Sequence, residues 1–346
     1  MRFANLLTIV FFIILTTTYA AAQNNVVGQD DAVEQSVIRA QNLLKKGDVE
    51  GAVGLLQTTS QNNPQNEVVK YWLGKAFYLQ GNYQKAIETL SGIAGKFPQD
   101  SNEQTQIVQM LGLAHYISGR LAEAIPYFEQ MMRRQPENGE AAYALGVCYI
   151  QTRQSAKSRD VFAKLFKVQI NSASAYLLNA QMLVRQQFEE TAEIELNKAL
   201  ELDPKLPQVR FILGELAIYR AEIDKGIELL KQEIALNPAN AMAYYRLGEG
   251  LSRQLKWDEA IPPLQKSVWL NPFFSGPYIV LGKVYLKKQD LGNAESMLRR
   301  STTIDPNNFG AHYLLAQVLQ QSGRTDEAKT EFALAEKLRG NGDKNP

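Results

Sequence analysis

Apolar and small residues between Ala241 and Phe274 recur with the spacing of two short helices. In the first half they follow the i, i+3, i+4, i+7 spacing that places side chains on one face of a helix. These residues are Tyr244, Leu247, Gly248 and Leu251. A second stripe lies at Ala260, Leu264 and Ser267 after a turn over residues 254–258, in which Asp258 is a plausible N-cap. Asn271-Pro272 then ends the second helix, since a proline cannot continue it. The pattern predicts two antiparallel helices, neither of which can bury its apolar stripe alone.

The same pattern recurs with a period of 34 residues from Val33 to Gly342, with a four-residue insertion at 101–104. The nine repeats are 33–66, 67–100, 105–138, 139–172, 173–206, 207–240, 241–274, 275–308 and 309–342. Position 8 of every repeat is small: Ala40, Gly74, Gly112, Gly146, Ala180, Gly214, Gly248, Gly282 and Ala316. Position 20 is also small throughout, and position 24 is always Leu or Phe. Glycine lowers helix propensity, so its recurrence indicates a close helix crossing, with a large side chain filling the gap beside it.

At these positions the chain resembles the tetratricopeptide repeat (TPR) family, whose pattern is W-x2-L-G-x2-Y, then A-x3-F, then P. The resemblance covers about nine-tenths of the chain. It implies an all-α fold, a right-handed α-solenoid of nine 34-residue helix-turn-helix repeats. It also implies a concave groove lined by positions 2, 5, 9, 12 and 13 of the first helices, which binds protein or peptide segments.

The first 22 residues have a different character. A short positive start at Met1-Arg2, an apolar run over Leu6–Leu15 and Ala20-Ala21-Ala22 match a signal peptide cut between Ala22 and Gln23. The alternative is an uncleaved membrane anchor, but the apolar run is shorter than the roughly 18–20 residues that span a bilayer. We expect residues 23–32 to form a flexible lead-in and residues 343–346 a disordered tail.

Composition narrows the location of the mature chain. Cys148 is the only cysteine, which excludes an intrachain disulfide, and no N-x-[ST] glycosylation acceptor occurs. We expect Cys148 to be packed and inert. These features favour export to a periplasm, with an extracellular location second, and no integral membrane segment after signal cleavage.

Little in the sequence suggests catalysis. His115 and His312 are the only histidines, and they lie nearly six repeats apart, so a shared metal site is implausible. No phosphate-binding glycine loop and no nucleophile–base arrangement is apparent, so we expect no catalytic residue, no cofactor and no metal. The chain has 37 Lys and Arg against 36 Asp and Glu, which gives no basic surface for nucleic acid.

Binding of other proteins is therefore the expected activity. Position 5 carries several aromatic residues, and charged residues gather at positions 6, 9 and 13 of repeats six to eight. The candidate groove residues are Tyr71, Trp72, Tyr143, Phe211, Glu215, Tyr245, Arg246, Glu249, Arg253, Lys283, Lys287 and Tyr313. Two structural alternatives stay open: the aromatic column packs against the neighbouring repeat, or the charges pair with one another.

Several irregular places carry their own expectations. The insertion is interpreted as one extra turn of the following helix, with Ser101 and Gln104 at capping-box spacing; a ligand-contacting loop is the alternative. Repeats four and five are the least regular, with Asn179 on a buried stripe. Trp269, Phe273 and Phe274 form either a local contact with repeat eight or a self-association or docking patch.

Two helix-level expectations concern the C-terminal half. Pro263 should bend or delay its helix. The last helix should present a polar outer face, with the residues Lys329, Glu331, Glu336, Lys337 and Arg339.

The sequence thus predicts an exported, non-enzymatic scaffold that binds protein or peptide segments in a TPR groove. The alternative is that it forms the regulatory or substrate-presenting arm of a separate polysaccharide-synthesis or sugar-transfer enzyme system.

Overall fold

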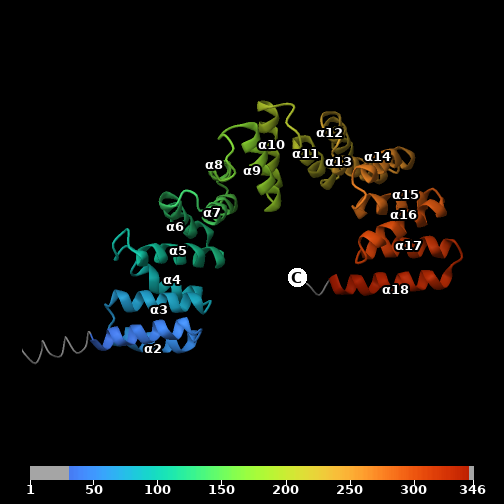
Figure 1. Cartoon of the computed structure of the whole chain (residues 1–346). Helices are drawn as coiled ribbons and strands as arrows, with labels where there is room; N and C mark the ends of the chain where they lie inside the picture. The colour runs from blue at the N-terminus through green and yellow to red at the C-terminus, as the bar shows by residue number, and fades with distance from the viewer. Residues whose placement is uncertain (1–30, 343–346) are drawn as a thin grey trace, which may run out of the picture. The chain divides into compact units, whose positions relative to one another are not determined.

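The computed structural model describes residues 31–342, and within that range it consists of helices and turns without strands (Figure 1). The predicted signal peptide (residues 1–22), residues 23–30 of the lead-in and the tail 343–346 lie outside the described residues. Asp31 and Ala32, the last two residues of the expected lead-in, are already helical. The chain divides between Ile170 and Asn171 into two compact units, which are described separately.

The first unit contains four helix pairs among its described residues. They are the helical residues 31–45 with α2 (Val49–Asn62), α3 (Glu67–Leu79) with α4 (Tyr83–Ser91), α5 (Asn102–Ile117) with α6 (Leu121–Arg134), and α7 (Gly139–Gln151) with α8 (Ser155–Leu165). The division after this unit falls two residues before the end of repeat four, close to its junction with repeat five, where the sequence is least regular.

The second unit continues with five helix pairs up to residue 342. They are α9 (Ala173–Arg185) with α10 (Glu189–Leu202), α11 (Val209–Tyr219) with α12 (Ile223–Leu236), α13 (Ala241–Arg253) with α14 (Trp257–Leu270), α15 (Ser275–Lys287) with α16 (Leu291–Ile304), and α17 (Phe309–Gln321) with α18 (Thr325–Gly342). The predicted all-α solenoid of helix pairs is confirmed.

Several first helices begin at a polar side chain that caps them, although α11 and α15 have no such cap. Asn240 is the N-cap of α13, and its side-chain oxygen accepts a hydrogen bond from the backbone N–H of Ala243 at 3.1 Å. Asn66, Asn138 and Asn308 cap α3, α7 and α17 in the same way. Each of these asparagines occupies position 34, so the last residue of one repeat starts the first helix of the next.

The second helix of repeat seven begins differently from the sequence expectation. Helix α14 starts at Trp257 with Lys256 as its N-cap, so Asp258 lies in the first turn and the N-cap prediction was wrong. The helix also runs through Pro262 and Pro263 without interruption, so Pro263 does not delay it. Both prolines lie beyond the first turn, because the N–H of Ala260 already donates to the carbonyl of Lys256, so each proline removes one potential intrahelical hydrogen bond.

The turn inside each repeat has one backbone conformation. Position 15 has a positive φ in all nine repeats, from +60° at Arg153 to +81° at Gly47. The next backbone N–H reaches the carbonyl of position 11, as from Lys256 to Leu251 at 3.0 Å, which is the Schellman arrangement. Only four of these nine residues are glycine: Gly47, Gly81, Gly119 and Gly323.

The core consists of contacts between successive repeats. One cluster joins Leu230 of repeat six, Leu247 of repeat seven and Leu281 of repeat eight, and similar clusters follow along the chain. Positions 3, 7 and 10 of a first helix pack against the preceding repeat, as Leu315 and Val318 of α17 pack with Leu298 of α16. Stability is therefore spread over nearest-neighbour interfaces.

The insertion at residues 101–104 adds a turn to α5, which begins at Asn102. Ser101 accepts from the backbone N–H of Gln104 at 3.1 Å, but the Gln104 side chain accepts from Gly95 instead of completing a capping box. Gly95 has φ +85° and follows the short helix α4, which ends at Ser91. The buried Gln104 thus ties the extended α5 to the irregular end of repeat two.

Among the described residues, no helix combines the length and the apolar composition needed to cross a membrane.

Candidate protein-binding surface

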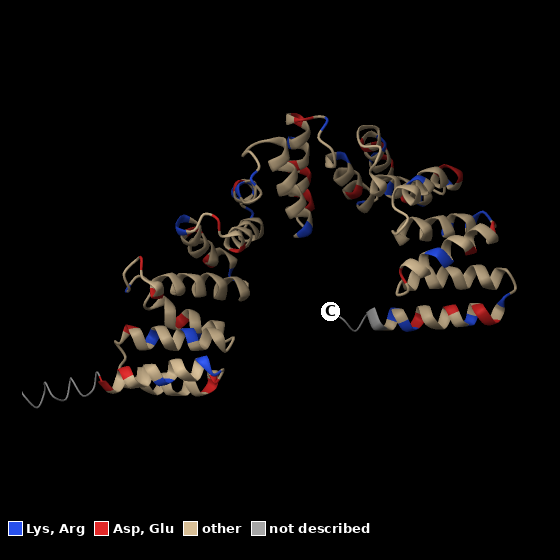
Figure 2. Cartoon of the chain, in the orientation of Figure 1, with Lys and Arg blue, Asp and Glu red and all other residues tan. Residues whose placement is uncertain are grey.

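The candidate surface lies on three successive first helices of the second unit. We call it the first-helix surface and define it by Glu215 of α11, by Arg246, Glu249 and Arg253 of α13, and by Lys283 and Lys287 of α15. Spacings of three and four residues place Arg246, Glu249 and Arg253 on one face of α13. The spacing of four residues places Lys283 and Lys287 on one face of α15. Figure 2 shows acidic and basic residues interspersed along the helices of both units.

Arg246 is the centre of a charged network on this surface. Its Nε donates to Glu215 at 2.7 Å and its NH1 group donates to Glu249 at 2.9 Å. Arg253 donates to the other oxygen of Glu249 at 2.9 Å. Burial lowers the pKa of Arg246, but its hydrogen bonds to Glu215 and Glu249 raise it more, so the guanidinium stays charged. These four residues therefore pair with one another, which is the alternative that the sequence left open for the charged positions.

A pocket of about 290 Å³ lies beside this network. Apolar side chains of α11, among them Ile212 and Leu216, line it together with Glu215, Arg246, Glu249 and Arg253. Tyr219 and Glu189 also line it and were not predicted as site residues. Tyr219 is 76% exposed and occupies position 13, so applying the position-13 rule to repeat six would have found it.

Lys283 and Lys287 differ from the arginines of α13. Both are exposed, and neither has an ion-pair partner among the described residues. They occupy positions 9 and 13 of repeat eight, which correspond to Glu249 and Arg253 of repeat seven. The surface therefore combines a paired network on α11 and α13 with two unpaired positive charges on α15.

Tyr245 lies next to this network but is half-buried. Its ring meets Phe274 edge-on, with ring centroids 5.0 Å apart, and Arg246 lies over it at 5.1 Å. Phe274 is the residue before α15, so the expected Trp269–Phe273–Phe274 patch is divided. Trp269 and Phe273 remain 70% and 78% exposed, and Lys266 lies over the Trp269 ring at 3.7 Å.

In the first unit, the predicted residues Tyr71 and Trp72 of α3 lie in a packed arrangement. Tyr71 is only 3% exposed, and its hydroxyl donates to Gln106 at 2.8 Å. Its ring meets Trp72 edge-on at 5.2 Å, and Lys75 lies 4.8 Å from the Trp72 ring centroid. Burial of Tyr71, and then the charge of Glu103, raise the pKa of its hydroxyl to about 12. Tyr71 thus packs against the following repeat, whereas Trp72 keeps part of its ring exposed.

The three remaining aromatic candidates lie apart from one another. Phe211 of α11 packs against the hydrophobic cluster of repeats six to eight. Tyr143 of α7 is 40% exposed and contacts Phe162 edge-on. Tyr313 of α17 contacts Phe332 in the last repeat, beyond the first-helix surface. Of the twelve predicted residues, the structure therefore brings together those of α11, α13 and α15.

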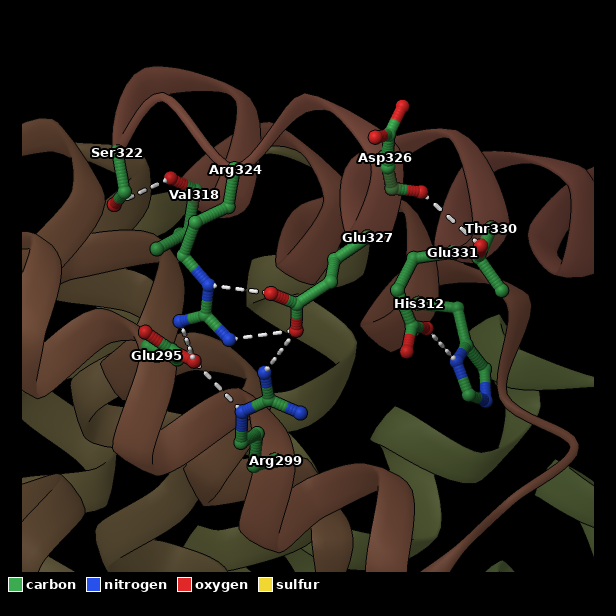
Figure 3. A network of polar contacts seen from close by, with 10 residues as sticks. All are labelled: Glu295, Arg299, His312, Val318, Ser322, Arg324, Asp326, Glu327, Thr330 and Glu331. Carbon is green, nitrogen blue, oxygen red and sulfur yellow. Dashed lines mark hydrogen bonds and ion pairs between the residues drawn. The ribbon is translucent and has the colours of Figure 1, made fainter.

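Groups that carry chemistry in other proteins are in structural roles here. His312 is buried, with Nδ1 2.6 Å from a carboxylate oxygen of Glu331 (Figure 3). Its Nε2 lies 3.0 Å from the carbonyl oxygen of Pro306. Cys148 is fully buried, and burial raises the pKa of its thiol to about 11. The described residues contain no group of His, Cys, Asp and Glu side chains that is arranged to hold a metal ion.

The sequence profile of the tetratricopeptide repeat family matches residues 43–108, 115–182 and 285–341, which together make up more than half of the chain. The chain belongs to the tetratricopeptide repeat family. BBSome complex member BBS4 of Bos taurus is 24% identical over 167 residues, which are 48% of this TPR chain and 31% of the relative. The human protein O-mannosyl-transferase TMTC1 is 25% identical over 144 residues, or 40% of this chain and 16% of the relative. The TPR chain thus spans about a third or less of these relatives.

Among solved structures, the TPR chain is similar to MamA (residues 41 to the end) from Desulfovibrio magneticus RS-1. The identity is 20%, the match covers 49% of this chain and 97% of that one, and the TM-score is 0.45.

Proposed function

We propose that this TPR chain is an exported, non-enzymatic scaffold that binds a protein or peptide segment on the first-helix surface of its second unit. The observation that carries the proposal is the contrast on that surface between paired and unpaired charges. The carboxylates of Glu215 and Glu249 are occupied by Arg246 and Arg253, whereas Lys283 and Lys287 have no counterpart among the described residues. The lysines are thus free to bind an acidic side chain or a terminal carboxylate of a partner.

The neighbouring pocket supplies the second part of such a site. Exposed Tyr219 and the apolar side chains of α11 give a partly apolar surface next to fixed hydrogen-bonding groups. Peptide-binding surfaces combine these two elements, because apolar contacts provide affinity and placed polar groups fix orientation. A segment that carries an apolar residue near an acidic one would match both.

The test compares two double variants with equal charge change. Lys283→Glu/Lys287→Glu reverses the unpaired charges, and Lys231→Glu/Lys256→Glu makes the same change on α12 and before α14. Partners are captured by crosslinking in the producing cells, and folding of both variants is checked by circular dichroism. We expect capture to fall at least tenfold in the first variant and to persist in the second. Equal capture by both would refute this surface as the binding site.

Export rests on the apolar run Leu6–Leu15 and on Ala20-Ala21-Ala22. N-terminal sequencing of the protein from fractionated cells tests it. A mature chain that starts at Gln23 in a periplasmic or extracellular fraction supports export, with the periplasm expected first. An intact Met1 in the cytoplasmic fraction contradicts it.

A second candidate function follows from the similarity to TMTC1, which is named as a protein O-mannosyl-transferase. The chain would then be the TPR arm of a separate sugar-transfer enzyme. Identification of the captured partner separates the candidates: a sugar-transfer enzyme whose activity falls when this chain is removed favours the arm. A partner without such activity favours the scaffold.

A further inference from the structure

The C-terminal end of the second unit exposes a face that is covered elsewhere in the unit. In repeat seven, this face is closed by the following repeat, because Leu281 and Val284 of α15 join the cluster of Leu264. The ring of Tyr245 at position 5 is covered at the same time by Phe274, the residue that precedes α15.

In repeat nine, the described residues leave the equivalent face open. Phe309, Gly310 and Tyr313 of α17 with Phe332 and Ala335 of α18 line a pocket of about 400 Å³, and its rim is completed by Glu336 and Arg339. These are positions 1, 2, 5, 24, 27, 28 and 31 of the repeat. Phe309 is 52% and Tyr313 49% exposed. We call this surface the end face. The expected polar outer face of the last helix is thus only partly present.

The first repeat rules out head-to-tail stacking of copies as the way to cover this face. A first helix that closes the preceding repeat uses positions 3, 7 and 10, which are Ala311, Leu315 and Val318 in α17 and are buried there. The same positions of repeat one are Gln35, Arg39 and Asn42, all exposed. A polar and charged stripe does not fill a pocket lined by phenylalanine and tyrosine, because its groups would lose water without gaining partners.

The charges at the rim point to a different partner. Near the start of α18, acidic and basic side chains are paired with one another (Figure 3). Glu295 accepts hydrogen bonds from Arg299 and Arg324, and Glu327 accepts from Arg324. Glu336 and Arg339, in contrast, have no ion-pair partner among the described residues. They lie three residues apart on α18, one acid and one base beside the same apolar pocket.

We propose that the end face binds a second copy of this chain about a two-fold axis. Such an interface uses the same patch on both copies, so each patch must be complementary to itself. With α18 antiparallel to its symmetry mate and the axis between residues 336 and 339, Glu336 of each copy faces Arg339 of the other. The rings of Phe309 and Tyr313 from both copies close the two pockets. They cover the end face in the way that Phe274 covers Tyr245 in repeat seven.

The test is sedimentation equilibrium of the full chain with charge-reversal variants at the rim. Glu336→Arg and Arg339→Glu each place like charges across the axis and should raise the dimer Kd roughly tenfold or more. The double variant Glu336→Arg/Arg339→Glu restores opposite charges and should return the Kd to within about threefold of wild type. Both residues are exposed, so the variants should fold, which circular dichroism checks.

Two further variants separate this interface from the exposed patch on α14. Tyr313→Asp should abolish the dimer, whereas Trp269→Asp should leave it unchanged, since Trp269 lies outside the end face. A wild-type chain that stays monomeric at all concentrations would overturn the proposal, as would loss of the dimer in Trp269→Asp but not in Tyr313→Asp. Failure of the double charge reversal to restore the dimer would also overturn it. In a two-fold dimer both copies carry the two substitutions, so opposite charges face each other again, whereas a partner with another sequence would keep its own charges.

Discussion

Gly248 of α13 crosses Leu264 of α14 so closely that a Cβ on the glycine would lie 2.4 Å from the Leu264 Cγ. The same relationship joins Gly74 to Leu90, Gly146 to Phe162 and Gly282 to Leu298, with 2.5 Å in each case. Position 8 must therefore be small where the position-24 side chain fills the crossing. Alanine at Ala40, Ala180 and Ala316 shows that some repeats accommodate one methyl group.

This crossing predicts that Gly248→Leu destabilises the second unit by about 3 kcal/mol, because the added side chain has no space between the two helices. The matched control is Gly292→Leu in α16, where a Cβ would meet nothing within 4 Å. Leucine there should be neutral or stabilise by up to about 1 kcal/mol through its higher helix propensity. Urea denaturation followed by circular dichroism measures both. A Gly248→Leu chain as stable as wild type would contradict the crossing.

The turn residue Leu255 offers a stabilising substitution. It has φ +62° and is 67% exposed, so its side chain gains little from packing while its backbone lies in the left-handed region. Leu255→Gly should stabilise the unit by about 1 kcal/mol, because glycine adopts this conformation without steric cost. Leu255→Ala keeps the Cβ and should show no such gain in thermal unfolding. A gain in both variants would place its origin in the lost leucine side chain.

The sequence predicted the helix pairs and the reason for the small residues, because burial repeats with a fixed period and one residue per repeat must be small. It did not predict which groove candidates are accessible. Tyr71 and Tyr143 share position 5, yet Tyr71 is buried through Gln106 and Phe97, whereas Tyr143 is exposed. Such differences depend on the neighbouring repeat and not on the position itself.

The sequence pattern also did not predict local changes in the backbone at the start of a helix. Repeat six starts its first helix at Val209, two residues late, because Gln208 adopts φ +72°. The buried carboxylate of Glu233 accepts the Gln208 backbone N–H at 2.9 Å and 3.1 Å, in a column where Ser267 and Ser301 occur in later repeats. The sequence shows the exceptional glutamate, but its backbone partner is visible only in the folded chain.

Cys148 should report local opening of the first unit. Its thiol is fully buried and burial raises its pKa to about 11, so at pH 8 only about one part in a thousand is thiolate in the folded chain. A disulfide reagent such as DTNB should label it slowly in buffer and within seconds in urea. If labelling requires opening, its rate should level off above about pH 8.5, the usual thiol pKa, instead of rising towards pH 11. Complete labelling within seconds in native buffer would contradict its burial.

Glu295 should make the end of the second unit sensitive to acid. It lies on α16 and accepts from Arg299 at 2.7 Å and from Arg324 at 2.6 Å (Figure 3). Burial raises the pKa of its carboxyl, but the hydrogen bonds from Arg299 and Arg324 outweigh burial and hold the pKa below its usual value of 4.5. Because the folded pKa is the lower one, the stabilisation is fully present above about pH 4.5 and is lost as the pH falls through the folded pKa.

Glu295→Gln should therefore cost about 1 kcal/mol at pH 7 and progressively less below pH 4.5, since the wild-type carboxyl becomes neutral there as well. Urea midpoints of both chains at pH 7 and pH 3 give the difference. Glu259→Gln in the first turn of α14 is the control, because Glu259 is exposed and has no ion pair among the described residues. A Glu295→Gln difference of the same size at both pH values would mean that the variant acts through packing, and the charged network would then contribute no pH-dependent stability.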